Sequence, residues 1–180
     1  MRAVFIDRDG VINANVERNG RPVAPTRLED FRLLPGVEEA ISRLKAARFK
    51  VIVITNQPDI ATGRTDRATV AAMHEEIRRR LEVDDIKVCA HADSDNCQCR
   101  KPKPGMLLEA AAEWGIDLAQ SYCIGDRWRD IEAGRAAGCL TLFVDYGYEQ
   151  DGPMQPDCTI GSLREAVSLI LHRQQWGDPK

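Results

Sequence analysis

Two aspartates near the amino terminus, Asp7 and Asp9, have a spacing that suits metal-assisted chemistry. In extended backbone, residues two apart point to the same side, so both carboxylates would face one site. Carboxylates held close together repel each other unless a cation lies between them. Mg²⁺ is the natural candidate, because it is a hard cation that prefers oxygen ligands. The alternative is a turn with solvated aspartates, and the apolar run at 3–6 directly before them favours the metal site.

Three cysteines and a histidine lie close together in the middle of the chain, in the pattern Cys89-x-His91-x5-Cys97-x-Cys99. Three thiolates and one imidazole make a complete tetrahedral zinc set. The residues at 92–96 contain no large apolar side chain that could hold them folded, and a structural zinc ion explains how this loop is fixed. A catalytic zinc is less favoured, because four protein ligands leave no position for water. The remaining alternative is four unrelated residues.

Positive charge follows the last cysteine directly, at Arg100, Lys101 and Lys103. Cations of this kind bind phosphate oxygens, and the neighbouring prolines stiffen the segment. The segment at 54–57, Ile-Thr-Asn-Gln, offers a hydroxyl and two amides that could also donate to phosphate. Each segment could instead be an ordinary solvated loop.

A further acidic pair, Asp126 and Asp130, follows an apolar run at 121–125. Residues four apart on the first turn of a helix lie on the same face, so both carboxylates could serve one metal site. The alternative is that Asp126 only caps the helix.

Apolar runs of strand length alternate along the chain with segments of helical periodicity. Strands are expected at 3–6, 50–55, 86–90, 121–125 and 140–144, and helices at 37–49, 67–81, 104–114, 128–137 and 163–173. This order predicts an α/β fold, a three-layer doubly wound parallel sheet with helices on both faces. Ligands bind such sheets at the carboxyl ends of the strands. Asp7, Thr55, His91 and Asp126 each lie at the carboxyl end of an expected strand or directly after it.

The 180 residues suit a single domain, expected at 1–173 and followed by a tail at 174–180. The net charge of −3 argues against the basic surface that nucleic-acid-binding proteins need. No apolar stretch approaches the roughly 18 residues of a membrane span. The amino terminus does not resemble a signal peptide. We therefore expect a cytoplasmic protein, monomeric because no apolar stripe remains once the helices cover the sheet.

In this combination and order, the motifs resemble those of the haloacid dehalogenase superfamily of phosphatases. The resemblance covers about residues 1–150, and it is carried by D-R-D-G-V-I-N at 7–13, I-T-N-Q at 54–57, C-x-H…C-x-C-R-K-P-K-P-G-M at 89–106 and G-D-x-x-x-D at 125–130. The zinc-stapled loop followed by Arg-Lys-Pro is the narrowest signal. Within the superfamily, the sequence is similar to the group that contains heptose-bisphosphate and histidinol-phosphate phosphatases. No insertion is long enough for a cap domain, so an open site with minimal or no cap is expected.

The resemblance implies roles for these residues. Asp7 would be the nucleophile that becomes a phospho-aspartate, and Asp9 the general acid and base. Catalytic Mg²⁺ would be held by Asp7, Asp9 and Asp126, with Asp130 just behind them. Structural Zn²⁺ would occupy the cysteine–histidine set.

Substrate contacts follow from the same resemblance. Thr55 and Lys101 would bind the transferred phosphoryl group. Further contacts would come from Asn56, Arg100, Arg127 and Lys103, with Lys103 the rival of Lys101 for the phosphate.

The expected substrate is a small phosphorylated molecule, most favourably heptose 1,7-bisphosphate. The alternatives are histidinol phosphate or another small phosphomonoester, and a catalytically silent binding module. The segment at 13–23 departs from the heptose-enzyme pattern, and its Arg18 and Arg21 are either rim residues or part of a solvated loop.

Overall fold

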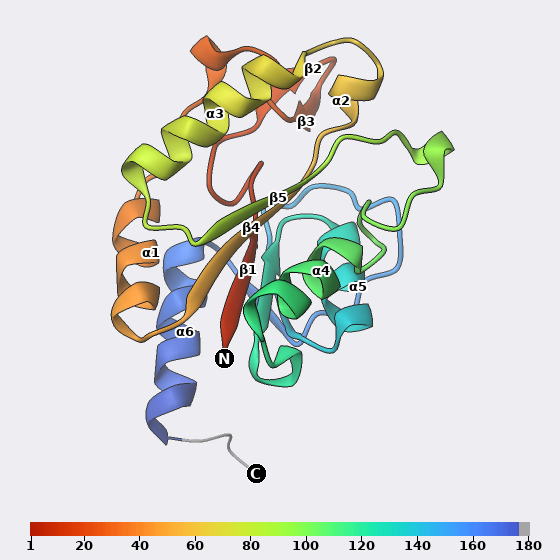
Figure 1. The fold of residues 1–180 in the computed structure, drawn as a ribbon. Helices are drawn as coiled ribbons and strands as arrows, with labels where there is room; N and C mark the ends of the chain where they lie inside the picture. Colours follow the sequence, from red (N-terminus) through yellow and green to blue (C-terminus); the bar gives the residue numbers. More distant parts are fainter. Residues whose placement is uncertain (177–180) are drawn as a thin grey trace.

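The centre of the molecule is a six-stranded parallel sheet with the strand order β5-β4-β1-β6-β7-β8 (Figure 1). The computed structural model describes the backbone of residues 1–176 and the side chains of residues 1–173. The sheet strands are β1 Ala3–Asp7, β4 Lys50–Asn56, β5 Asp85–Cys89, β6 Tyr122–Gly125, β7 Leu140–Val144 and β8 Cys158–Ile160. The first five confirm the strands expected from the sequence. The edge strand β8 was not predicted, because three residues are too few to show a strand period.

Helices cover both faces of this sheet. They are α1 Val37–Ala46, α2 Pro58–Ala61, α3 Arg67–Arg80, α4 Gly105–Trp114, α5 Trp128–Ala137 and α6 Leu163–Trp176, with short 3-10 turns η1 Leu28–Asp30, η2 Asp93–Asp95 and η3 Leu118–Gln120. Buried apolar residues of α1, α3 and α6 contribute to one core cluster, and buried apolar residues of α4 and α5 contribute to another. The predicted three-layer α/β fold is thus confirmed.

The carboxyl-terminal helix is longer than the sequence indicated. It continues to Trp176, so its backbone includes the first three residues of the tail that was expected at 174–180. The rest of that tail, 177–180, lies outside the described residues. In the part of the chain that the structure describes, no helix has the length and apolar character needed to cross a membrane.

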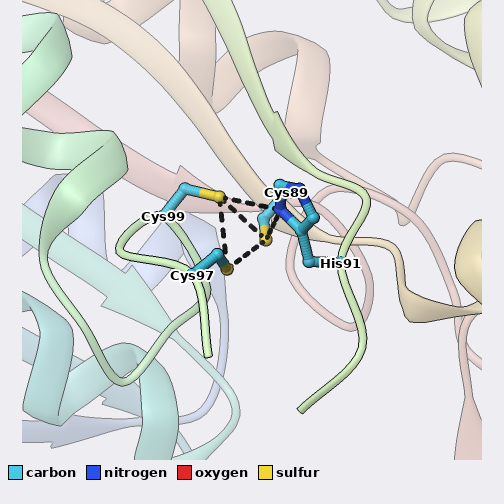
Figure 2. A group of neighbouring side chains, drawn as sticks. All are labelled: Cys89, His91, Cys97 and Cys99. Carbon is cyan, nitrogen blue, oxygen red and sulfur yellow. Dashed lines mark hydrogen bonds between the residues drawn. The ribbon is translucent and has the colours of Figure 1, made fainter. Parts of the chain in front are cut away.

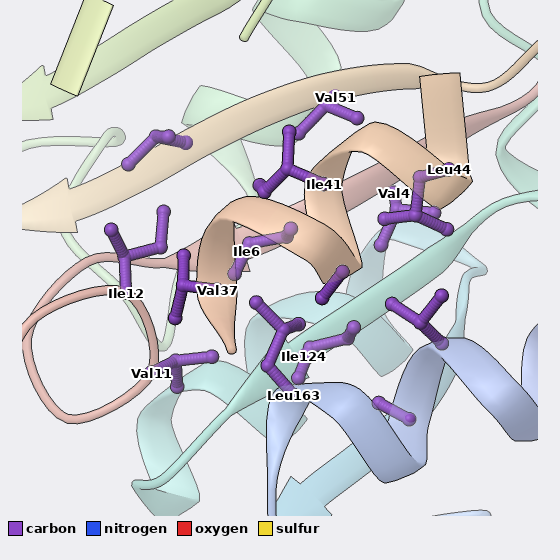
Figure 3. Close-up of a cluster of buried hydrophobic side chains, with 14 of the residues drawn as sticks. Val4, Ile6, Val11, Ile12, Val37, Ile41, Leu44, Val51, Ile124 and Leu163 are labelled. Atoms are coloured by element: carbon purple, nitrogen blue, oxygen red, sulfur yellow. The ribbon is translucent and has the colours of Figure 1, made fainter. Parts of the chain in front are cut away.

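Alternate residues of β1 pack into the two cores. Val4 and Ile6 belong to the cluster that includes α1 and α6, which Figure 3 shows, whereas Phe5 belongs to the cluster that includes α4 and α5. Because both faces of the strand are covered, its sequence is continuously apolar rather than alternating. The strand ends at Asp7, so the packing of its two faces fixes where that carboxylate lies.

A small antiparallel hairpin and the short helix α2 lie beyond the carboxyl ends of the strands (Figure 1). The hairpin consists of β2, Val16–Arg18, and β3, Arg21–Val23. Its turn residues Asn19 and Gly20 have φ of 54° and 72°. Asn-Gly favours such two-residue turns, so the sequence carried a hairpin signal that the prediction did not use. These small elements agree with the expected minimal cap.

Candidate active site

The candidate site lies where β1 meets β6 at the carboxyl edge of the sheet. Strand β1 pairs with β4 on one side and with β6 on the other, so the chain changes direction across the sheet at this point. Ligand sites of doubly wound sheets form at such switch points. Asp7 ends β1, Thr55 lies near the end of β4, and Asp126 follows β6. The structure therefore brings these three predicted residues to one edge.

The ammonium group of Lys101 is buried between two carboxylates. Its side chain is 3% exposed, and Nζ lies 2.6 Å from Oδ1 of Asp7 and 2.6 Å from Oδ1 of Asp130. Nζ also donates to the carbonyl oxygen of Ile54 at 3.0 Å. Burial opposes the charge on Lys101, but Asp130 and Asp7 outweigh it and raise the pKa of the ammonium above its usual value. The lysine favoured by the sequence is thus the one that lies beside Asp7.

Two other predicted substrate contacts have different partners. The Asn56 side chain donates to the carbonyl oxygen of Lys101 and accepts from its backbone N–H, each at 3.1 Å. Asn56 therefore holds the main chain of Lys101, and its amide is already occupied. Lys103 donates to Oδ1 of Asn96 at 2.7 Å and to the carbonyl oxygen of Cys97 at 2.8 Å. Its ammonium is directed at the cysteine loop, so the structure does not bring Lys103 to Asp7.

Three buried carboxylates, those of Asp7, Asp126 and Asp130, have oxygen atoms within 4.8 Å of one another. Burial raises the pKa of Asp7 well above its ordinary range, and Asp130 adds to this effect while Lys101 opposes it. Burial, with Asp130, also raises the pKa of Asp126 to about 7. Among the described residues, the buried Oδ1 of Asp126 has no hydrogen-bond partner. An all-carboxylate donor set with an orphaned oxygen fits Mg²⁺, which would supply both the partner and the charge.

Two glycines make room for this cluster. A Cβ on Gly10 would lie 2.2 Å from Oδ2 of Asp126, and Gly10 has a φ of 93° that side chains disfavour. A Cβ on Gly125 would lie 2.1 Å from Cβ of Asp130. Each of the two acidic motifs therefore needs its glycine, because a side chain at that position would clash with a carboxylate-bearing residue.

The carboxylate of Asp9 is held by a ring of donors. Oδ1 accepts from Nη2 of Arg8 at 2.9 Å and from Nδ2 of Asn13 at 3.0 Å, and Oδ2 accepts from Nε2 of Gln57 at 2.7 Å. The fully buried Thr55 hydroxyl donates to Oδ2 at 3.4 Å. Thr55, predicted to bind phosphoryl oxygens, is directed at Asp9 in this structure. Arg8 lay inside a quoted motif without an assigned role, and the Gln57 amide, considered as a possible phosphate donor, binds Asp9 instead.

A cavity of about 360 Å³ opens above Asp7, Asp9 and Lys101. Five arginines line it: Arg18, Arg64, Arg100, Arg127 and Arg129. Of these, the sequence predicted Arg100 and Arg127 as substrate contacts and left Arg18 open. Arg64 and Arg129 were missed. Arg21 is exposed and is absent from the described lining of the cavity.

The five arginines that line the cavity form its rim, and two aspartates orient four of them. Asp93 in the cysteine loop accepts from Nε of Arg100 at 2.6 Å and from Nη1 of Arg129 at 2.9 Å. Asp59 of α2 is paired with Arg18 of the hairpin at 3.6 Å and with Arg64 at 3.2 Å. Because each aspartate is shared by two arginines, the rim keeps a net positive charge.

The fifth rim residue, Arg127, links the hairpin to the segment after β7. Its Nη2 donates to the carbonyl oxygen of Pro22 at 2.9 Å, and its guanidinium carbon lies 5.0 Å from the centre of the Tyr148 ring. Its Nε is 3.5 Å from Oδ2 of Asp126. Arg127 therefore lies between the carboxylate cluster and the rim of the cavity.

The predicted zinc ligands come together beyond the end of β5 (Figure 2). Sγ of Cys89 lies 3.1 Å from Sγ of Cys99 and 3.6 Å from Sγ of Cys97, and Nδ1 of His91 lies 3.3 Å from Sγ of Cys99. Zinc–sulfur bonds of about 2.3 Å separate tetrahedral sulfur ligands by roughly 3.8 Å. The four atoms would need to spread by less than about 1 Å to hold the ion. All the cysteines are free thiols, so the cluster fits zinc.

Comparison with known proteins supports the resemblance to phosphatases that the sequence motifs indicated. A family model described as haloacid dehalogenase-like hydrolase matches residues 14–138. The D-glycero-β-D-manno-heptose-1,7-bisphosphate 7-phosphatase of Bordetella bronchiseptica is 38% identical over 152 residues, which are 82% of each chain, and that of Yersinia pestis is 35% identical over 95% of this chain and 96% of its own.

Solved structures agree with these relatives. The D,D-heptose 1,7-bisphosphate phosphatase of B. bronchiseptica, solved with magnesium and phosphate, superposes with a TM-score of 0.80 at 31% identity, over 96% of this chain and 99% of that one. The corresponding enzyme of Burkholderia thailandensis gives a TM-score of 0.69 at 28% identity, over 95% and 99%. From the matched family, these relatives and the carboxylate–lysine site, we conclude that the chain belongs to the haloacid dehalogenase-like hydrolases and is a phosphatase.

Proposed function

We propose that this phosphatase removes the 7-phosphate of D-glycero-β-D-manno-heptose 1,7-bisphosphate through a phospho-aspartate on Asp7. The observation that carries the proposal is the cavity above Asp7, where Lys101 lies beside the carboxylate and arginines line the walls. A bisphosphate brings a second anionic group, and Arg100 and Arg127 are the predicted rim residues that would meet it. Relatives of 35% to 38% identity over most of the chain are heptose bisphosphate 7-phosphatases.

In the first step, a carboxylate oxygen of Asp7 attacks the phosphorus atom of the 7-phosphate. The bond between phosphorus and the sugar oxygen breaks, and the departing oxygen takes its proton from Asp9. Lys101 holds Oδ1 of Asp7, which leaves Oδ2 to attack, and the ammonium also attracts the phosphoryl oxygens. A carboxylate nucleophile divides hydrolysis into two easier reactions.

In the second step, water attacks the phosphorus of the phospho-aspartate. Asp9 accepts the proton of this water, the bond between phosphorus and Asp7 breaks, and inorganic phosphate leaves. When bound by Asp7, Asp126 and the backbone carbonyl of Asp9, Mg²⁺ would reduce the repulsion between carboxylate and phosphate. Asp130 holds the other side of Lys101 and so keeps the ammonium in place.

The substrate is tested by measuring phosphate release with Mg²⁺ from a panel that contains the heptose bisphosphate, histidinol phosphate and simple sugar monophosphates. We expect kcat/KM for the bisphosphate to exceed the others by at least about 10²-fold, since the partly buried guanidinium groups of Arg100 and Arg127 would lack the second phosphate as a partner in the other substrates. The Asp7→Asn variant, purified by the same procedure, controls for contaminating phosphatases. Faster release from histidinol phosphate, or no release from any compound, would contradict the proposed substrate.

We also propose that the cysteine–histidine cluster holds a structural Zn²⁺ that fixes the loop at 89–101. This loop contains Asp93, which orients two rim arginines, and it ends at Lys101 beside Asp7. The ion would thus act on catalysis through the positions of these cations.

Zinc removal should therefore destabilise the protein and slow it. We expect Cys97→Ser to lose the metal and to lower Tm by at least roughly 6 °C, which for a chain of this size corresponds to about 1.5–3 kcal/mol. Cys158→Ser is the matched control, because it changes a half-buried cysteine outside the cluster. This variant should keep the metal, the wild-type Tm and the wild-type activity. Metal analysis, thermal unfolding and phosphate release measure the three effects. Wild-type protein purified without zinc, yet fully active, would rule out this role.

A further inference from the structure

A buried histidine on α3 contacts the arginine that lies between the two catalytic aspartates. His74 is 5% exposed, and its Nε2 lies 3.1 Å from Nη1 of Arg8, which is fully buried. His74 is one turn away from Ile77 and next to Met73, two core residues of the same helix. Neither the sequence motifs nor the two-step mechanism uses it.

The hydrogen bond between these two groups has one possible direction. Arginine has only N–H donors and stays protonated in proteins, so Nη1 of Arg8 donates and Nε2 of His74 accepts. The imidazole is therefore neutral, with its proton on Nδ1. The pKa of His74 is lowered to about 4, mainly by burial and also by the positive charges of Arg8 and Arg78, while Asp9 has the opposite effect. The acceptor is thus present throughout the neutral range.

The rest of the Arg8 guanidinium is committed to Asp9. Nη2 donates to Oδ1 at 2.9 Å, and Nε lies 3.1 Å from Oδ1 and 3.2 Å from Oδ2. The guanidinium carbon lies 5.9 Å from the centre of the Phe31 ring. His74 holds one edge of the guanidinium, and the carboxylate of Asp9 occupies the other edge.

We propose that His74 is a positioning residue for proton transfer by Asp9, because it fixes the orientation of Arg8 and thereby that of the Asp9 carboxylate. This inference rests on the proposed role of Asp9 as general acid. A general acid must lie within hydrogen-bond reach of the departing oxygen. A displacement of about 1 Å from the productive geometry can lower a rate by roughly 10²-fold. Without the histidine acceptor, Nη1 of Arg8 loses a buried partner, and the guanidinium no longer holds its side of the Asp9 carboxylate in a fixed orientation.

The test compares two variants on two substrates. His74→Leu keeps a similar volume but has no acceptor, whereas His74→Gln offers the oxygen Oε1. The substrates are the heptose bisphosphate, whose alcohol leaving group needs a proton, and p-nitrophenyl phosphate, whose leaving group is stable as an anion and needs little proton donation. The parameter is kcat/KM, which reports the steps up to departure of the leaving group.

We expect His74→Leu to lower kcat/KM for the sugar substrate by roughly tenfold or more, the size expected from a lost hydrogen bond to a charged group. The value for p-nitrophenyl phosphate should change by less than about twofold, because its leaving group makes little use of the acid. His74→Gln should restore most of the sugar activity. Ile77→Val, one turn further along α3 and in the core, is the matched control and should affect neither substrate selectively.

Asp9→Asn separates a failure of this inference from a failure of the proposed function. If Asp9→Asn lowers kcat/KM equally for both substrates, Asp9 is not the general acid, and the mechanism itself is wrong. Suppose instead that Asp9→Asn lowers kcat/KM for the sugar substrate far more than for p-nitrophenyl phosphate. If His74→Leu then lowers kcat/KM equally for both substrates, or changes neither value, the positioning role of His74 is overturned. Failure of His74→Gln to recover sugar activity, at an unfolding temperature equal to that of the wild type, overturns it as well.

Discussion

Asp7→Asn is expected to reduce phosphate release by at least about 10³-fold, because removing the nucleophile of a covalent mechanism removes the reaction path itself. An amide has nearly the same shape as a carboxylate, but its oxygen is uncharged and is a far weaker nucleophile toward phosphorus. Lys101 would keep its contacts with Asp130 and Ile54, so the site should remain assembled. Phosphate release from the heptose bisphosphate with Mg²⁺ measures the effect.

The same substitution should leave the fold intact, and thermal unfolding provides the check. Burial raises the pKa of Asp7 well above its ordinary range, which means that the folded state disfavours its charge. A neutral asparagine avoids this cost, so without added metal the variant should be at least as stable as the wild type. Asp145→Asn is the matched control, because Asp145 likewise lies at the carboxyl end of a sheet strand, directly after β7, but is exposed. If Asp7→Asn kept more than a few per cent of the activity, the phospho-aspartate mechanism would be wrong.

Lys101→Met is expected to damage both activity and stability. The substitution keeps a long apolar side chain but removes the cation between Asp7 and Asp130, so buried carboxylates remain without their partner. Removing one member of a buried ion pair costs about 3–5 kcal/mol. We also expect kcat to fall by at least about 10²-fold, since a preorganised charge at the transferred phosphoryl group is lost.

The stability loss should depend on pH with a definite sign. Without Lys101, the pKa of Asp7 rises still further in the folded state, so the penalty is present while the carboxylates are ionised and shrinks as falling pH protonates them. Lys103→Met is the matched control, since Lys103 lies two residues further along and donates to the cysteine loop instead of Asp7. Urea unfolding at several pH values, with phosphate release at neutral pH, tests both variants. Equal losses in Lys101→Met and Lys103→Met would contradict the assignment of Lys101.

The sequence by itself determined the fold class and the family, and it indicated the acidic residues that the structure brings together. Strands β1 and β4 are continuously apolar because they are covered on both faces, and this local pattern is readable without a structure. Asp7 and Asp126 directly follow or end such strands, so the sheet topology was enough to bring them together. The four residues proposed as zinc ligands lie within an 11-residue segment of the chain, and their spacing alone indicates the cluster.

Only the tertiary structure decided which polar groups face the substrate cavity and which face each other. Asn56 holds the backbone of Lys101, and Thr55 is directed at Asp9, although both looked like phosphate ligands at the end of a strand. Arg64 enters the rim through Asp59, which also binds the hairpin. These contacts join segments that are distant in the sequence, and local periodicity contains no information about them.

His74 shows the same limit most clearly. In the sequence it is one polar residue beside the apolar stripe of a helix, and nothing in its neighbourhood points to Asp9. Its contact with Arg8 spans 66 residues and forms only in the folded chain, where His74 of α3 meets the residue that directly follows β1. Short-range patterns determine which elements form, whereas the hydrogen bonds that orient a catalytic group depend on how the finished elements meet.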